Sequence, residues 1–165
     1  MILVYAGKGK GKTCACVGQA MRALGRNLSV AFAQFLKRDG KAGEQEILRR
    51  LLGDDFRAGG LGFFRREEDR EKHEREARLL ISWAKARESD MIILDEALWA
   101  LERGLIDVGD LAPLLERRGS LSRHLVLSGR PLPKAIRELA DLITEMRDER
   151  HYYRAGVPAQ AGLEY

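Results

Sequence analysis

The residues best suited to chemistry form a glycine- and lysine-rich stretch near the start of the chain, GKGKGKT at positions 7–13. Gly11, Lys12 and Thr13 fill the last three places of the phosphate-loop pattern G-x-x-x-x-G-K-[S/T], with Ala6 where the first glycine is usual. Glycines let backbone N–H groups converge on phosphate oxygens, Lys12 can reach the distal phosphates, and the Thr13 hydroxyl can ligate Mg²⁺. The predicted nucleotide-binding residues are Gly7, Lys8, Gly9, Lys10, Gly11, Lys12 and Thr13.

A second candidate element is the apolar run MIIL at 91–94, which ends in Asp95 and Glu96. In phosphate-loop proteins, a carboxylate after such a strand holds the Mg²⁺ complex close to the hydroxyl of the loop. The alternative is a strand followed by an acidic turn without a metal. The presence of the loop favours the metal site, and we predict Thr13, Asp95 and Glu96 as its ligands.

Apolar runs alternate with helical patterns along the chain, which predicts an α/β fold: a mostly parallel sheet flanked by helices in three layers. The carboxyl ends of the strands would carry both candidate elements. Strands are expected at 2–6, 28–35, 91–94, 124–128 and 142–145. Helices are expected at 12–24, 44–52, 67–87, 108–117 and 133–139. We expect Gly25 to end the first helix and Asp107 to cap the fourth.

Length and composition predict one domain, residues 1–165, with 45% apolar and 33% charged residues. No apolar stretch approaches the length of a membrane span and no signal region precedes the first strand, so we expect a cytoplasmic protein. Cys14 and Cys16 point in different directions on a helix, which argues against a disulfide or zinc site. The last segment, 151–165, is expected to lie on the sheet edge.

The net charge of +4 raises the question of nucleic acid, but the charges are mixed and not interleaved with aromatic residues. The densest charged run, 65–78, alternates in sign and is typical of a solvated helix face. The histidines, His73, His124 and His151, have no catalytic neighbour in sequence, and we expect His73 on the surface. The mixed charges and the lack of aromatic residues between them argue against a nucleic-acid-binding protein.

Phosphate loops serve many reactions, but further segments narrow the choice. Together they closely resemble the phosphate-loop family of ATP:cob(I)alamin (corrinoid) adenosyltransferases, essentially from end to end. The segments are YAGKGKGKT at 5–13, QFLK at 34–37, GE at 43–44, ILDE at 93–96, LVLSGR at 125–130, ADLITEM at 140–146 and GVPAQAGLEY at 156–165. The resemblance implies a RecA-like sheet topology, a homodimer, and a corrinoid as the second substrate.

The family reaction implied here is attack of cobalt(I) on the ribose 5′ carbon of ATP, with triphosphate as the leaving group. Because the metal is the nucleophile, no serine, cysteine or histidine has to be activated. Lys10, Lys12, the loop amides and Mg²⁺ are expected to stabilise the triphosphate. The family's second acid is the nearer metal ligand, which favours Glu96. Arg22 matches a family arginine close to the nucleotide.

The chain departs from the family pattern at three places. Phe63 matches an aromatic residue that displaces the lower axial ligand of the corrinoid, but Phe64 replaces a threonine and Arg65 stands where tryptophan is usual. Cys14 occupies the place of a second threonine after the loop. The chain also begins at the first strand and has no N-terminal helix. Two phenylalanines in the core are the alternative to a corrinoid-contacting Phe63.

Two other functions remain open at this stage. One is a generic phosphate-loop ATPase or kinase, although no second motif supplies a base for an acceptor hydroxyl. The other is an ATP-dependent corrinoid-binding or regulatory protein without catalysis, which Arg65 suggests. Expected partners are ATP and a corrinoid, with a flavoprotein as one conceivable reductant, and neither nucleic acid nor a membrane.

Overall fold

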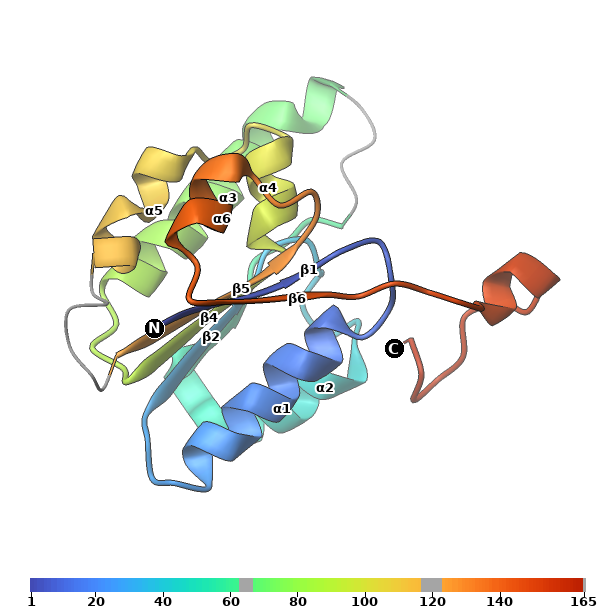
Figure 1. Cartoon of the computed structure of the whole chain (residues 1–165), viewed down its shortest axis with the longest axis horizontal. Helices are drawn as coiled ribbons and strands as arrows, with labels where there is room; N and C mark the ends of the chain where they lie inside the picture. The colour runs from blue at the N-terminus through green and yellow to red at the C-terminus, as the bar shows by residue number, and fades with distance from the viewer. Residues whose placement is uncertain (63–66, 117–122, 165) are drawn as a thin grey trace.

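The centre of the protein is a six-stranded sheet in the order β3-β2-β4-β5-β1-β6, in which every neighbouring pair is parallel (Figure 1). The computed structural model describes residues 1–62, 67–116 and 123–164. The strands are β1 (Ile2–Ala6), β2 (Val30–Gln34), β3 (Phe56–Ala58), β4 (Met91–Asp95), β5 (His124–Gly129) and β6 (Leu142–Glu145). The predicted parallel sheet is confirmed.

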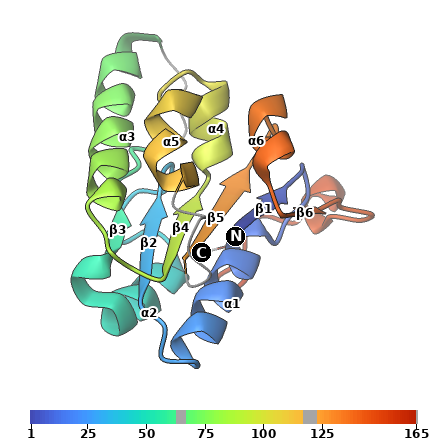
Figure 2. The ribbon, with the colours of Figure 1, turned by 60° about the vertical axis from the view of Figure 1, so that its left-hand side comes forward.

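Helices cover both faces of this sheet, so the predicted three-layer arrangement is also confirmed (Figure 2). One face packs against α1 (Lys12–Leu24) and α2 (Gly43–Leu52). The other face packs against α3 (Arg70–Lys85), α4 (Ala97–Glu102), α5 (Val108–Leu115) and α6 (Lys134–Leu139). Short 3₁₀ turns lie at Gly53–Asp55, Glu67–Asp69 and Tyr152–Ala155.

Successive side chains of each central strand point to opposite faces of the sheet, so each strand contributes to two hydrophobic cores. In β4, Ile92 and Leu94 join the core under α3–α6, whereas Met91 and Ile93 join the core under α1 and α2. Because both faces are covered, these strands are continuous apolar runs, as parallel strands usually are. The packing of the two cores thus fixes the carboxyl ends of β1, β2, β4 and β5 side by side, at the same end of the sheet.

Two short elements were not predicted, and one helix begins later than expected. β3 has three residues and α4 has six, so neither repeats its pattern often enough to be detected. The predicted helix at 67–87 is a 3₁₀ turn followed by α3. Asp107 caps α5 as predicted, accepting the Asp110 N–H at 2.9 Å. Gly25 follows α1 as predicted, and its N–H bonds Met21 O at 3.0 Å.

The prediction that His73 lies on the surface was wrong. Its side chain is buried on α3, in one stripe with Ala77, Leu80, Ile81 and Ala84. The spacing of this stripe is helical, but charged residues between its members concealed it in the sequence.

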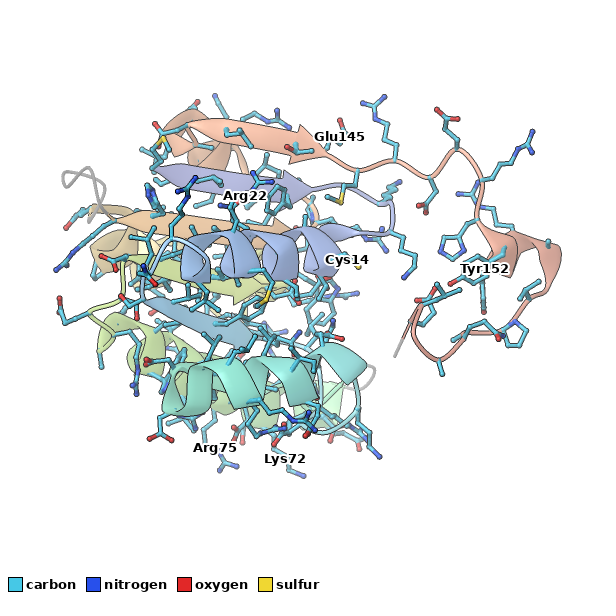
Figure 3. All side chains as sticks on the ribbon, turned by 90° about the horizontal axis from the view of Figure 1, so that it is seen from below. Cys14, Arg22, Lys72, Arg75, Glu145 and Tyr152 are labelled. Atoms are coloured by element: carbon cyan, nitrogen blue, oxygen red, sulfur yellow. The ribbon has the colours of Figure 1, made fainter. Side chains whose placement is uncertain are left out.

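The expectation for the C-terminal segment was also wrong. After β6 the chain runs beyond the carboxyl edge of the sheet, forms the turn Tyr152–Ala155 and doubles back (Figures 1 and 3). Residues 153–164 are exposed rather than packed along β6. The segment instead returns toward the phosphate loop, where its contacts bear on the site described below.

Candidate active site

The phosphate loop connects β1 directly to α1 at the carboxyl edge of the sheet. Gly11 has φ 104° and sits immediately before the first helical residue, Lys12. This left-handed conformation suits glycine, which has no Cβ to clash. The N-terminus of α1, a favourable place for a phosphate anion, therefore faces the space above the sheet.

Gly7 and Gly9 are required by a close approach of two backbones. A Cβ at Gly7 would lie 2.3 Å from Met146 O, and one at Gly9 would lie 2.7 Å from Arg147 N. The Gly9 N–H bonds Met146 O at 2.9 Å, and the Lys10 N–H bonds Asp148 Oδ1 at 2.8 Å. The conformation of the first half of the loop is therefore fixed by the segment that follows β6.

Asp95, fully buried at the end of β4, is the centre of a polar cluster beside the loop. Its carboxylate accepts hydrogen bonds from Thr13 Oγ1 at 3.0 Å, Ser128 Oγ at 2.6 Å and Gln34 Nε2 at 3.3 Å. The Lys37 ammonium lies 3.7 Å from the same carboxylate. The predicted meeting of the loop hydroxyl with the acid after the apolar strand is thus observed for Thr13 and Asp95.

Lys37 links this cluster to α2. Its Nζ lies 3.2 Å from Thr13 Oγ1 and 2.5 Å from Glu44 Oε1. Gln34 donates to the same Glu44 oxygen at 3.0 Å and accepts from Gln45 Nε2 at 2.9 Å. Burial opposes ionisation of Glu44 most strongly, yet the hydrogen bonds from Lys37 and Gln34 outweigh it and keep its pKa below the usual value. The ion pair with Glu44 therefore positions the Lys37 side chain next to Thr13.

Glu96 occupies a strained position at the junction of β4 and α4. Its φ of 62° is left-handed, which is uncommon for a residue other than glycine, and its N–H donates to Ser128 Oγ at 2.9 Å. Burial and the neighbouring Asp95 raise the pKa of Glu96, while Lys12, Lys37 and Arg130 act in the opposite direction. A further cation at this position would stabilise its charged form.

The oxygen atoms of this cluster suit Mg²⁺. Mg²⁺ takes oxygen ligands at about 2.0–2.1 Å in an octahedron, so adjacent ligands lie about 3 Å apart. Thr13 Oγ1 and Asp95 Oδ2 are separated by 3.0 Å, and the Lys37 ammonium already lies against both side chains. No group of three or more His, Cys, Asp or Glu side chains in the described part of the chain could hold a metal alone. A hydroxyl, a carboxylate, waters and phosphate oxygens are the usual Mg²⁺ set.

The loop lysines point to different neighbours. Lys12 Nζ donates to Gly9 O at 2.8 Å, across the loop that it would close around phosphates. Lys10 Nζ donates to Leu163 O and lies 3.6 Å from Glu164 Oε2, both on the returning C-terminal segment. Tyr152 in turn donates to Glu164, and this hydrogen bond raises the pKa of Tyr152 to about 12.

Other predicted site residues lie farther from the cluster or cannot be placed. Cys14 is exposed in the first turn of α1, whereas Arg22 lies in its last turn, roughly 13 Å along the helix axis from Thr13 (Figure 3). Phe63, Phe64 and Arg65 lie outside the described residues. The structure therefore brings together Thr13, Asp95 and Glu96 but separates Arg22 from them.

Four polar residues of the cluster had no assigned role in the sequence: Gln34, Lys37, Glu44 and Ser128. Each stands in a segment that carries the family resemblance, and Gln34 and Ser128 also lie at the carboxyl ends of strands. That position was the available signal, because ligands bind there in parallel sheets. Their partners come from separate elements, which a local pattern does not show.

Comparison with known proteins decides among the functions that a phosphate loop allows. Residues 1–165 match the model of the family described as ATP:corrinoid adenosyltransferase BtuR/CobO/CobP. The chain belongs to this family. Corrinoid adenosyltransferases of Sinorhizobium sp and Escherichia coli strain K12 are 35% and 32% identical to it, over 100% of this chain and 80% and 85% of theirs. The flagellar accessory protein FlaH from Methanocaldococcus jannaschii shares only the fold, with a TM-score of 0.56 and 18% identity over 87% of this chain and 69% of that one.

Family membership confirms the resemblance seen in the sequence. The protein is an enzyme whose substrates are ATP and a corrinoid, and whose reaction is transfer of the adenosyl group. A kinase, a plain ATPase and a non-catalytic corrinoid-binding protein are not favoured. No helix within residues 1–62, 67–116 and 123–164 is long and apolar enough to cross a bilayer.

Proposed function

We propose that the described site acts on the leaving group of adenosyl transfer and leaves the attack itself to the corrinoid. Cobalt(I) would attack the ribose 5′ carbon, the cobalt–carbon bond would form, and the electron pair of the breaking carbon–oxygen bond would pass to triphosphate. The protein then has to orient the reactants and stabilise anionic charge. The observation that carries this proposal is the cluster of Thr13, Asp95 and Lys37 next to the phosphate loop.

Each charged residue of the site has a role in this proposal. Lys12 and Lys10 neutralise charge that develops on the triphosphate, and the N-terminus of α1 adds its partial positive charge. Lys10 first has to exchange Glu164 for a phosphate oxygen. Lys37, positioned by its ion pair with Glu44, is a further cation at the Thr13 side of the site.

Thr13, Asp95 and Glu96 are proposed to hold Mg²⁺, which would bridge triphosphate oxygens and offset their charge. Asp95 fixes the Thr13 hydroxyl through the contact at 3.0 Å. Glu96 is proposed as the nearer carboxylate ligand, because burial and the neighbouring Asp95 disfavour its charged form and a bound cation would stabilise it. Lys37 would then move from Thr13 toward Glu44 as the metal enters.

The remaining features of the proposal rest on the sequence. Phe63 would contact the corrinoid opposite the attacking face, and Arg22 and Cys14 would lie along the nucleotide. The enzyme would act as a homodimer in the cytoplasm, supplied with electrons by a reductant such as a flavoprotein. Two free cysteines, Cys14 and Cys16, are compatible with a reducing compartment.

The direct test is anaerobic incubation of the protein with ATP, Mg²⁺ and chemically reduced cobalamin. We expect the absorption spectrum of adenosylcobalamin to appear and triphosphate to be released in equal amount. ADP as the product would indicate a kinase or ATPase, and intact ATP with bound corrinoid would indicate a protein without catalysis. Either of these outcomes would overturn the proposal.

A further inference from the structure

A cavity of about 830 Å³ opens beside the phosphate loop, and neither Thr13 nor Asp95 lines it. Its walls come from α4, from the turn after β5, from α6, and from the end of β6 with the segment that follows. Of the phosphate loop, only Gly7 and Lys8 line it. The cavity is therefore next to the triphosphate site without being part of it, and its volume suits a ligand of nucleotide size.

The cavity is strongly basic. Its lining contains six cationic side chains, Lys8, Arg103, Arg130, Arg137, Arg147 and Arg154, against three acidic ones. Arg147 pairs with Glu145 at 2.7 Å. Within the described part of the chain, no ion pair joins Arg130, Arg137 or Arg154 to an acid. Guanidinium groups bind phosphate oxygens in pairs of hydrogen bonds, so this lining fits a phosphate ester.

One wall of the cavity carries an aromatic ring and aliphatic side chains. The Arg103 guanidinium lies over the Trp99 ring, 5.0 Å from its centre, and Ile143 and Leu132 lie on the same lining. A Cβ at Gly129 would lie 3.1 Å from Trp99 N, so β5 packs tightly against the start of α4 and holds this wall in place. Aromatic rings and stacked guanidinium groups are the surfaces on which heteroaromatic bases bind.

A phosphate ester joined to a heteroaromatic base is a nucleotide, and the reaction contains two. One is ATP, whose triphosphate has its own cations in Lys10, Lys12 and Lys37 and whose adenosine is uncharged. The other is the nucleotide tail of a complete corrinoid, which carries a phosphodiester and a base. An excess of cations outside the triphosphate site is explained by the second ligand and not by the first.

We propose that this cavity binds the phosphodiester and base of the corrinoid's nucleotide tail. The proposal rests on the adenosyl transfer described above and adds a substrate preference to it. Corrinoids with the tail would bind more tightly than precursors that lack it. Arg137 and Arg154 would contact the phosphodiester, and the base would lie against Trp99.

The kinetic test compares cobalamin, which has the tail, with cobinamide, which lacks it, both pre-reduced to cobalt(I). We expect Arg137→Gln and Arg154→Gln each to raise the KM for cobalamin about five- to tenfold, the loss of one charge-assisted contact. The KM values for cobinamide and for ATP should change less than twofold. The matched control is Arg150→Gln, which removes an exposed arginine of the same segment that does not line the cavity.

A second readout does not depend on turnover. In a Trp83→Phe background, Trp99 is the only tryptophan of the chain, and titration with α-ribazole phosphate, the isolated nucleotide, should quench its fluorescence. Arg154→Gln should weaken this quenching. Equal effects on both corrinoids, a raised KM for ATP, or no quenching would overturn the inference. Absence of adenosylation with either corrinoid, with quenching intact, would instead contradict the proposed function.

Discussion

The Ser128 hydroxyl lies 2.6 Å from Asp95 Oδ1 and ties the end of β5 to the carboxylate at the end of β4. Ser128 Oγ also accepts a hydrogen bond from the Glu96 N–H at 2.9 Å. A single buried serine thus positions both acids of the proposed metal site. Because β5 lies between β4 and β1, it also fixes these acids relative to the strand that carries the phosphate loop.

Replacement of this serine should therefore impair catalysis more than folding. Ser128→Ala removes a buried hydrogen bond to a charged group, an interaction of about 1.5–3 kcal/mol, and we expect turnover to fall at least tenfold. The measurement is steady-state adenosylation at saturating ATP, with Mg²⁺ varied. Ser89→Ala is the control, since Ser89 is also buried but lies just before β4, at the amino ends of the strands. An unchanged rate for Ser128→Ala would show that the acids need no support from β5.

Lys12→Ala should lower kcat/KM about a hundredfold, because loss of one cation that stabilises the triphosphate costs roughly 2–4 kcal/mol in the transition state. Thermal unfolding should be nearly unchanged. Lys134→Ala, which removes an exposed lysine on α6, serves as the control. Near-normal adenosylation by the Lys12 variant would remove this residue from the mechanism.

Asp95, the last residue of β4, and Glu96, which follows it, should differ in a Mg²⁺ titration. Asp95 already accepts hydrogen bonds from Thr13, Ser128 and Gln34. Burial, in contrast, disfavours the charged form of Glu96 and raises its pKa. Glu96→Gln should therefore raise the Mg²⁺ concentration for half-maximal activity more than tenfold, and Asp95→Asn should raise it less. The reverse order would assign the metal to Asp95.

The raised pKa of Glu96 also predicts how stability depends on pH without ligands. A carboxyl group whose folded-state pKa is raised contributes stability below its unfolded pKa, and this contribution is lost as the pH rises through the folded pKa. Glu96→Gln, which stays neutral, should have a higher Tm than the parent at pH 7. The difference should disappear toward pH 4. A lower Tm for the variant at pH 7 would contradict the direction of the shift.

The contact between Lys10 and Glu164 predicts that the Glu164 carboxylate competes weakly with ATP for Lys10. Because both side chains are partly exposed, the ion pair contributes little, and Glu164→Gln should lower the KM for ATP about two- to threefold at low salt. The effect should fade at high ionic strength. Glu149→Gln, an exposed acid before the turn, is the control. An increased KM would mean that Glu164 positions Lys10 for ATP.

Local sequence patterns were sufficient to predict the elements that carry the site. The loop at 7–13, the acids at 95 and 96, and the strands and helices that carry them each depend on neighbours in sequence, and they were predicted. The parallel sheet followed from their alternation. The bounds of β1, α1 and β6 agree with the structure, because a turn, a glycine or a charged residue marks each end.

Contacts between distant segments were not predictable in this way. The Gln34–Lys37–Glu44 network depends on where α2 packs against β2, and the burial of His73 depends on which face of α3 meets the sheet. The close packing of Gly7 and Gly9 against the backbone at 146–147 depends on a segment more than a hundred positions away. The network and the glycine contacts leave no periodic signal in one sequence, and the helical spacing of the His73 stripe was concealed by the charged residues between its members.

The dependence of Gly7 and Gly9 on residues 146–148 also has a consequence during biosynthesis. A ribosome makes the loop well before the segment that shapes it, because Lys10 and Asp148 are 138 positions apart in the chain. A nascent chain therefore contains the proposed phosphate-binding lysines, Lys10 and Lys12, long before the loop that carries them can adopt its final conformation. Competence to bind ATP should arise late, when the sixth strand has left the exit tunnel and closed the sheet beside the first.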